Sequence, residues 1–191
     1  MKKNIVLIGF MGAGKTETGR ILAKDTGFNF IDIDALIEKQ EGITITEIFE
    51  KKGEKHFRDL ETEILKKIEK IMVSDFKSDT IIFDSKSDFK PEAPFVISTG
   101  GGMPAFNGNM KILKNIGTVV YLKADPHIIY ERIKSETHRP VLGAGNFTLK
   151  SVQDKLKERE KFYGQADITV YTDGLSARGA AEEIEIFLNF Y

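Results

Sequence analysis

Cysteine is absent from the chain. The absence excludes disulfides and thiolate metal sites, and it fits a protein of a reducing compartment. An excess of charge of one sign is also missing, because 28 basic and 29 acidic residues give a formal net charge of −1. Such a balance provides no basic field that would attract nucleic acid. We therefore expect no nucleic-acid partner.

The start of the chain also lacks a long apolar run. Its first apolar segment, residues 5–8, is too short to cross a bilayer. Glycines follow at the point where the apolar core of a signal peptide would continue. From this we expect a soluble, cytoplasmic protein without a membrane partner. The chain has 191 residues, 41% of them hydrophobic, which suits a single domain, residues 1–191.

A phosphate-binding loop is the clearest motif that is present. Residues 9–16 read G-F-M-G-A-G-K-T and match the pattern G-x-x-x-x-G-K-[ST], with an apolar run before them and a helical pattern after them. Glycines allow backbone N–H groups to converge on phosphate oxygens, and a helix N-terminus adds positive potential. Lys15 would reach the outer phosphates, and the Thr16 hydroxyl could ligate Mg²⁺. This context favours a nucleoside triphosphate site over a glycine-rich turn that binds nothing.

Short apolar segments recur along the chain with helical patterns between them. This alternation predicts a parallel sheet that is covered by helices on both faces. Ligands of such folds collect at the carboxyl ends of the strands. The expected strands are residues 5–8, 28–31, 95–98, 118–122 and 168–171.

Two carboxylates, Asp32 and Asp34, follow the second expected strand. Strand alternation would place both on the same side of the sheet, near the phosphate loop. One could then contribute to the Mg²⁺ shell and the other could bind a substrate hydroxyl. The alternative is that Asp34 caps the helix that begins with Ala35. The presence of two acids favours a functional pair.

Arg58 lies on a long helix that we expect from about Glu54. Apolar residues recur on this helix at three- and four-residue spacing, at positions 57, 60, 64, 68 and 71, and form a core stripe. Glu54 and Glu61 lie within one turn of Arg58, which is typical of a solvated ladder of ion pairs. Spacing alone therefore does not select Arg58 as functional.

The glycine triplet at residues 100–102 follows the third strand and allows close backbone approach, although a tight turn is also possible.

Two further segments have irregular sequences. Residues 74–94 are rich in charge, serine and aspartate, and we expect them to be an insertion with a solvated surface. In residues 137–146, Arg139 and Pro140 are followed by flexible glycines. This composition is typical of a lid that closes and delivers a guanidinium, with an ordinary surface loop as the alternative.

Taken together, these motifs resemble the shikimate kinase family. The resemblance covers nearly the whole chain and implies the α/β fold of a three-layer P-loop kinase. That fold has a five-stranded parallel sheet flanked by helices, with a lid loop. The motifs that carry the resemblance are G-F-M-G-A-G-K-T at residues 9–16, D-I-D at 32–34, F-R-D-L-E at 57–61, S-T-G-G-G at 98–102, R-P at 139–140 and R-E-K-F-Y at 159–163.

The resemblance implies transfer of the γ-phosphoryl group of ATP to the 3-hydroxyl of shikimate, a step of chorismate and aromatic amino acid biosynthesis. It implies one Mg²⁺ per subunit, ATP as co-substrate, and a monomer. The implied substrate-binding segment spans about residues 34–62, and the lid about 135–150. Catalysis would rest on Lys15, Asp34 and Arg139. The remaining implied roles are ATP binding by Gly12, Ala13, Gly14, Lys15, Thr16, Glu17, Arg132 and Arg139, shikimate binding by Asp34, Arg58, Gly101 and Arg159, and Mg²⁺ binding by Thr16 and, through water, by Asp32.

The chain departs from the family pattern at two places. Lys161 stands where the family usually has proline, which concerns the start of the local helix more than the site. The loop at residues 172–177 matches poorly, so no adenine contacts are assigned there. One alternative function is another small-molecule P-loop kinase that acts on gluconate or a nucleotide. The other is a nucleotide-dependent regulatory domain, which would not require Arg58, Gly101 and Arg159 together.

Overall fold

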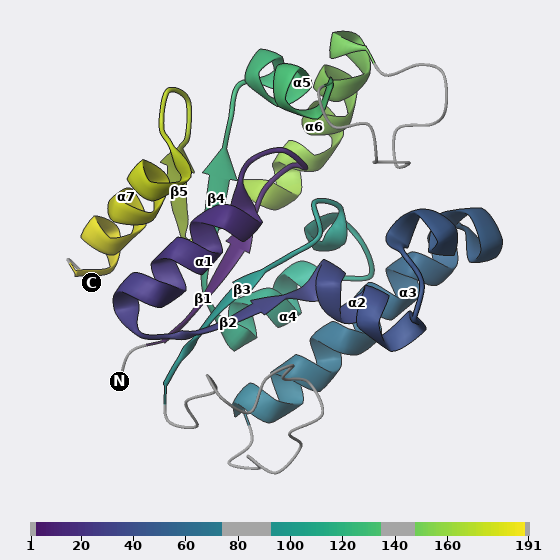
Figure 1. Cartoon of the computed structure of the whole chain (residues 1–191), viewed down its shortest axis with the longest axis horizontal. Helices are drawn as coiled ribbons and strands as arrows, with labels where there is room; N and C mark the ends of the chain where they lie inside the picture. Colours follow the sequence, from purple (N-terminus) through teal and green to yellow (C-terminus); the bar gives the residue numbers. More distant parts are fainter. Residues whose placement is uncertain (1–2, 74–92, 135–147, 190–191) are drawn as a thin grey trace.

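The structure is a computed structural model of the chain, and it describes residues 3–73, 93–134 and 148–189. Five parallel strands form one sheet in the order β2-β3-β1-β4-β5, with helices on both of its faces (Figure 1). The predicted five-stranded α/β fold is therefore confirmed. The strands are β1 (Asn4–Ile8), β2 (Asn29–Asp32), β3 (Phe95–Ser98), β4 (Gly117–Lys123) and β5 (Ile168–Tyr171).

The helices lie between these strands in the chain. They are α1 (Lys15–Thr26), α2 (Ile33–Glu41), α3 (Ile45–Val73), α4 (Asn109–Ile116), α5 (Pro126–Lys134), α6 (Leu149–Tyr163) and α7 (Ala177–Asn189), with a short 3₁₀ turn η2 (Met103–Ala105). Among the described residues, no helix is long and apolar enough to cross a membrane.

The sheet divides the core into two clusters, because successive strand residues point to opposite faces. On the central strand β1, Ile5 and Leu7 pack with the buried residues of α1 and α7, such as Leu22 and Ile184. The other two apolar residues of β1, Val6 and Ile8, face the opposite side of the sheet and pack with α3, α4 and α6. Every residue of β1 after Asn4 is buried, as expected for a strand covered on both faces.

Helix α3 is bent at Gly53, which has φ 83° and ψ 166°. Its first part begins with a reciprocal cap in which the Thr44 N–H donates to Glu47 and the Glu47 N–H donates to the Thr44 hydroxyl. The second part begins at Glu54, as predicted from the sequence. Four residues of the predicted stripe are buried (Phe57, Leu60, Ile64 and Ile68), and the fifth, Ile71, is half-buried.

Helix α6 begins at Leu149, after a capping box between Thr148 and Ser151. It ends at Tyr163, so Lys161 lies in its last turn. The expectation that Lys161 concerns the start of the helix is therefore wrong, because the helix starts three turns earlier in the chain.

The carboxyl ends of β1, β2 and β3 lie at the same edge of the sheet, since these strands are parallel neighbours. The phosphate loop, the Asp32–Asp34 pair and the glycine triplet follow these three strands and are thereby brought together. Most of the expected insertion and most of the expected lid, including Arg139, lie outside the described residues.

Candidate active site

The phosphate loop wraps around the side chain of Lys15. Helix α1 begins at this lysine, and its Nζ donates hydrogen bonds of 2.9 Å to the carbonyl oxygens of Gly9 and Phe10. The side chain is almost completely buried, and it lines the cavity described below. A cation is therefore held at the N-terminus of α1, where the helix dipole is positive as well, and both favour an anionic ligand.

Oxygen atoms converge next to this loop. The Thr16 hydroxyl donates to one Asp32 carboxylate oxygen at 2.7 Å. The Ser98 hydroxyl oxygen lies 3.4 Å from the Thr16 hydroxyl oxygen. Such hydroxyl and carboxylate oxygens are the donors that Mg²⁺ prefers. Within the described part of the chain, no three His, Asp or Glu residues cluster to form an all-protein metal site. The residues therefore suit an ion that is held mainly by phosphate and water.

Asp32 and Asp34 differ from their predicted arrangement. Strand β2 ends at Asp32 and α2 begins at Ile33, so Asp34 lies in the first helical turn and strand alternation does not relate the two. The helix cap is Asp32, whose second carboxylate oxygen accepts from the Ala35 N–H at 3.2 Å. The alternative in which Asp34 is the cap is therefore wrong, and Asp34 is available for another task.

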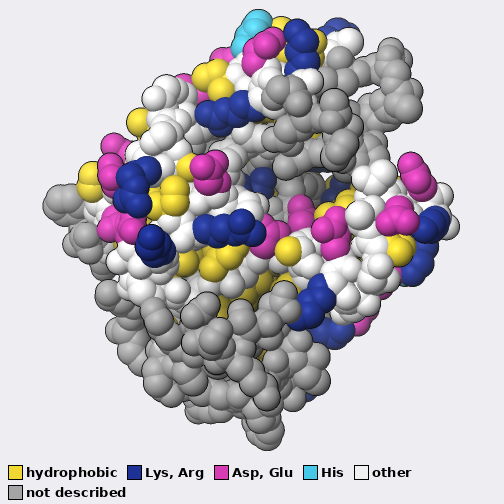
Figure 2. Space-filling view, viewed as in Figure 1, with side chains coloured by type: hydrophobic (Ala, Val, Ile, Leu, Met, Phe, Trp, Pro, Cys, Tyr) yellow, Lys and Arg dark blue, Asp and Glu magenta, His cyan; other side chains and the backbone are white. Residues whose placement is uncertain are grey.

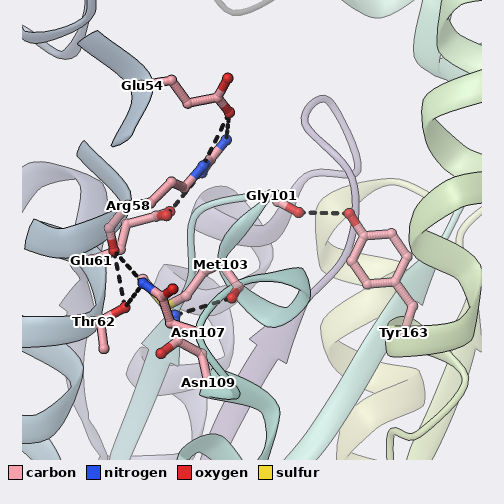
Figure 3. Close-up of polar contacts among 9 residues, drawn as sticks. All are labelled: Glu54, Arg58, Glu61, Thr62, Gly101, Met103, Asn107, Asn109 and Tyr163. Atoms are coloured by element: carbon pink, nitrogen blue, oxygen red, sulfur yellow. Dashed lines mark hydrogen bonds and ion pairs between the residues drawn. The ribbon is translucent and has the colours of Figure 1, made fainter. Parts of the chain in front are cut away.

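Arg58 is buried, with a side-chain exposure of 6%. Its guanidinium contacts Glu61 at 2.8 Å and Glu54 at 2.9 Å (Figure 3). It also lies 4.5 Å from the centre of the Phe106 ring. Glu61 has no exposed surface at all. The interpretation as a solvated ladder is therefore wrong for Arg58 and Glu61, although the Glu54 side chain is 55% exposed. Sequence spacing could not reveal this, because the loop that contains Phe106 covers the arginine from elsewhere in the chain.

The Glu61 carboxyl group is an unusual acid. Burial raises its pKa to about 7, while Arg58 lowers it, Asp34 raises it further and Arg159 lowers it. One of its oxygens, Oε1, has no hydrogen-bond partner among the described residues. A buried carboxylate is stable only with compensating charges or donors. Glu61 is thus held by Arg58 on one side and has spare acceptor capacity on the other.

We expect the stability of the folded chain to report the titration of Glu61. Its pKa is 4.5 when unperturbed and about 7 in the folded state, so the folded chain binds the proton more tightly. The stabilisation from this proton is complete below about pH 4.5 and is lost as the pH rises through about 7. A glutamine has no such proton. The Tm of the unsubstituted chain minus that of Glu61→Gln should therefore be largest near pH 5 and should shrink toward pH 8.

Thermal unfolding at constant ionic strength across this range would measure the difference. Glu63→Gln is the matched control, because Glu63 lies on the same helix with 54% of its side chain exposed. A Glu61→Gln difference that does not change with pH, like that of the control, would mean that Glu61 ionises as an ordinary carboxyl group.

The glycine triplet lies against these charged groups. A Cβ on Gly100 would stand 2.5 Å from Glu61 Oε1 and 2.7 Å from Asp34 Oδ1. A Cβ on Gly102 would stand 2.5 Å from Arg58 Nη1. Contacts this short would force the Glu61, Asp34 or Arg58 side chain to shift, so glycine lets these charged groups keep their positions. The triplet is therefore a place of close approach to three charged side chains and not only a turn.

Arg159 reaches the same region from helix α6. It is buried, with 6% exposure, and its guanidinium lies 5.3 Å from the centre of the Phe10 ring. Among the described residues, its buried Nη1 has no hydrogen-bond partner. A buried guanidinium donor without a partner is costly. Arg159 is thus arranged to receive an anion.

One cavity of about 970 Å³ connects all of these groups. Figure 2 shows the molecule hollowed at this place, with basic side chains visible inside the hollow. All of the predicted site residues within the described part of the chain line the cavity, and Arg139 lies outside the described residues. The predicted residues in the lining are Gly12, Ala13, Gly14, Lys15, Thr16, Glu17, Asp32, Asp34, Arg58, Gly101, Arg132 and Arg159.

The cavity is also lined by residues that the sequence did not identify as site residues. Glu61 appeared in the sequence only as an ion-pair neighbour of Arg58 and as part of the F-R-D-L-E motif, and Glu38 gave no signal. The loop at residues 172–177, to which no contacts were assigned, also contributes to the lining. Arg132 is fixed near the phosphate loop, since its Nη1 donates to the Gly12 carbonyl at 3.1 Å.

The comparisons with known proteins agree with this arrangement. The family model described as Shikimate kinase matches residues 11–74 and 85–189. The chain belongs to the shikimate kinase family. The shikimate kinase of Thermodesulfovibrio yellowstonii is 41% identical over 95% of this chain and 92% of its own length. That of Persephonella marina is 37% identical over 95% of this chain and 96% of its own length.

A solved structure of the family shares the fold. The shikimate kinase from Acinetobacter baumannii in complex with shikimate is 34% identical, with a TM-score of 0.83 over 99% of this chain and 94% of that one. Identity at this level over nearly the whole chain shows that the likeness to the family is not limited to the phosphate loop.

Proposed function

We propose that the chain phosphorylates the 3-hydroxyl of shikimate with ATP and releases shikimate 3-phosphate and ADP. The single observation that carries this is a cavity lined both by the phosphate loop and by two buried arginines, Arg58 and Arg159. A compact substrate with both a hydroxyl and a carboxylate suits such a cavity, because guanidinium groups pair well with carboxylate. Membership of the family supports the same substrate.

ATP would bind with its phosphates in the loop at residues 9–16. Lys15, now hydrogen-bonded to two loop carbonyls, would turn its ammonium group to the outer phosphate oxygens. Thr16 and, through water, Asp32 would hold one Mg²⁺ per subunit, which supplies positive charge to the phosphates when bound. Arg132 would lie on the nucleotide side, near Gly12.

Asp34 would orient the acceptor. It lines the cavity beside the glycine triplet, so close to Gly100 that a Cβ there would stand 2.7 Å from Asp34 Oδ1. As the shikimate oxygen forms its bond to the γ-phosphorus and the bond to ADP breaks, the hydroxyl proton would pass to the Asp34 carboxylate. Arg139, which is not among the described residues, would supply charge to the transferring group as part of the lid.

The acid group of shikimate would bind in the part of the cavity lined by Arg58 and Arg159. Arg58 is held in place by Glu54, Glu61 and the Phe106 ring. The buried Nη1 of Arg159 has a donor to offer, and Gly101 also lines the cavity. A sheltered carboxylate that accepts from each arginine would gain about 1.5–3 kcal/mol per charge-assisted hydrogen bond.

We expect Arg159→Ala to raise the shikimate KM and to leave the ATP KM nearly unchanged. The loss should be about 10- to 150-fold in kcat/KM, which corresponds to one charge-assisted hydrogen bond. Arg58→Ala should show the same kinetic effect. It should also lower the Tm, because it leaves Glu61 buried without its ion-pair partner. Lysine at position 58 should rescue only in part, since it offers a point charge and no planar fork.

A coupled ADP-release assay measures these effects. Arg178→Ala is the control, because this arginine is exposed on α7 and pairs with Asp25. A neutral ester of shikimate should be a poor substrate for the unsubstituted enzyme, and the two alanine variants should discriminate less between ester and acid. If both variants still preferred the acid as strongly, the carboxylate would be bound elsewhere.

The alternatives are tested by the same assay with other acceptors. ADP release that requires gluconate or a nucleoside monophosphate would indicate another small-molecule kinase, and ADP release that no acceptor stimulates would indicate a regulatory domain. A monomeric state, a cytoplasmic location, the single domain 1–191, the substrate-binding segment at about 34–62, the insertion at about 74–94 and the lid at about 135–150 stay predictions.

A further inference from the structure

One long-range hydrogen bond joins the glycine triplet to helix α6. The Tyr163 hydroxyl donates to the Gly101 carbonyl oxygen at 2.6 Å, between residues 62 positions apart (Figure 3). Tyr163 has no exposed surface, and burial raises its pKa to about 12, so the hydroxyl keeps its proton at neutral pH. Tyr163 follows Arg159 by four residues, which places both on the same face of α6.

The Gly101 carbonyl differs from its two neighbours in the triplet. The Gly100 carbonyl accepts from the Met103 N–H at 3.1 Å, and the Gly102 carbonyl accepts from the Ala105 N–H at 3.0 Å. These two are held by local turns, whereas the middle carbonyl is held from outside the loop. Consecutive glycines leave the backbone unusually free to rotate. The bond from Tyr163 is therefore the restraint on the central peptide.

This restraint also determines the direction of an N–H group. In a planar trans peptide, the C=O of Gly101 and the N–H of Gly102 point in opposite directions. A carbonyl directed to Tyr163 on α6 aims the Gly102 N–H away from α6. Arg58 lies on the other side of Gly101 from Tyr163 in Figure 3, and Gly102 packs directly against its guanidinium. The peptide between the two glycines thus has the Tyr163 hydroxyl on its Gly101 side and the Arg58 guanidinium beside Gly102.

We propose that Tyr163 is a positioning residue for the acid-binding end of the cavity. It holds the Gly101–Gly102 peptide in one orientation. Because Tyr163 and Arg159 are on the same helix, it also fixes the position of this peptide relative to Arg159. The backbone donors of the triplet and the Arg159 guanidinium are thereby presented to the acceptor as one unit. This inference rests on the function proposed above, since that function places the acid group of the substrate at these residues.

The phosphate loop touches the same peptide. A Cβ on Gly101 would stand 2.9 Å from the Met11 nitrogen, so the triplet fits closely against the phosphate loop. That contact remains when the tyrosine hydroxyl is removed. Loss of the hydroxyl should therefore affect the acceptor end of the cavity and spare the nucleotide end.

The test is Tyr163→Phe, which removes the hydroxyl and keeps the buried ring. We expect the shikimate KM to rise about 3- to 10-fold, as for the loss of one buried hydrogen bond, with the ATP KM within about twofold of the unsubstituted value. Tyr121→Phe is the matched control. The Tyr121 ring lies 5.0 Å from that of Tyr163, and its hydroxyl donates to Glu160, which Lys123 continues to hold. Both variants lose one hydroxyl from the same ring pair, but only one of these hydroxyls contacts the triplet.

A second readout does not depend on the substrate. Amide hydrogen exchange of the ligand-free protein should be faster at residues 100–103 in Tyr163→Phe than in Tyr121→Phe, while β1 is unchanged. Faster local exchange together with a raised shikimate KM supports the proposal. Equal exchange in the two variants, or KM values that rise equally for both substrates, would overturn it. If the unsubstituted protein did not use shikimate, the proposed function would fail. The exchange measurement would still show whether the Tyr163 hydroxyl restrains the triplet.

Discussion

Replacement of Lys15 by methionine should remove nearly all turnover, with a loss of at least about 10²–10³-fold in kcat. Lys15 is the first residue of α1, and its ammonium group lies in the phosphate loop beside the cavity. Methionine fills a similar volume but brings no charge to the transferring phosphoryl group. A coupled ADP-release assay with saturating shikimate would measure the change.

The same substitution tests what Lys15 does for the fold. Its two hydrogen bonds to the Gly9 and Phe10 carbonyls would be lost, and the cost should be about 1–3 kcal/mol. For a chain of this length, that corresponds to a fall of about 2–12 °C in Tm. Lys24→Met is the control, because Lys24 is exposed in the last turn of the same helix. Turnover near that of the control would show that Lys15 does not act on the phosphates.

Asp34→Asn should keep ATP binding and should lower phosphoryl transfer by about 10²–10⁴-fold, the usual contribution of a general base. The amide cannot accept the hydroxyl proton as the carboxylate can. The loss would be at the low end if the proton leaves late, in a loose transition state. Isothermal titration with a non-hydrolysable ATP analogue and single-turnover kinetics would separate binding from chemistry.

The structure makes the Asp34 experiment cleaner than the sequence suggested. Since Asp32 caps α2, the substitution of Asp34 leaves the cap in place and should change the Tm little. Removal of a negative charge from the first turn costs a few tenths of a kcal/mol. Asp59→Asn is the control, because Asp59 has 57% of its side chain exposed and pairs only with Lys55 in the described structure. Unchanged turnover with a lowered Tm would assign Asp34 a structural role instead.

A substantial part of the site could be predicted from local patterns. The phosphate loop is a continuous motif whose function depends on backbone conformation, so residues 9–16 identify it without knowledge of the rest of the chain. The five strands are short apolar runs between helical patterns, and the structure confirms each of them within two residues at either end. The carboxyl-edge location of the site follows from parallel topology alone.

Predictions that relied on an assumed local geometry were less reliable. Asp32 and Asp34 were related by strand alternation, but the strand ends between them and a helix begins. Element boundaries depend on capping, and here either aspartate could have served as the cap. The Arg58 trio was likewise assigned to the surface, because its spacing is the same whether or not another segment covers it.

The sequence by itself determined the fold class, the phosphate loop and, through the combination of motifs, the family. The tertiary structure alone decided that Arg58 and Glu61 are buried and that Tyr163 holds Gly101. The physical reason is that secondary structure and phosphate binding arise from residues close in sequence. Burial, and the pKa of Glu61 that follows from it, arise from the packing of α3, α6 and the glycine triplet, which are far apart in the chain.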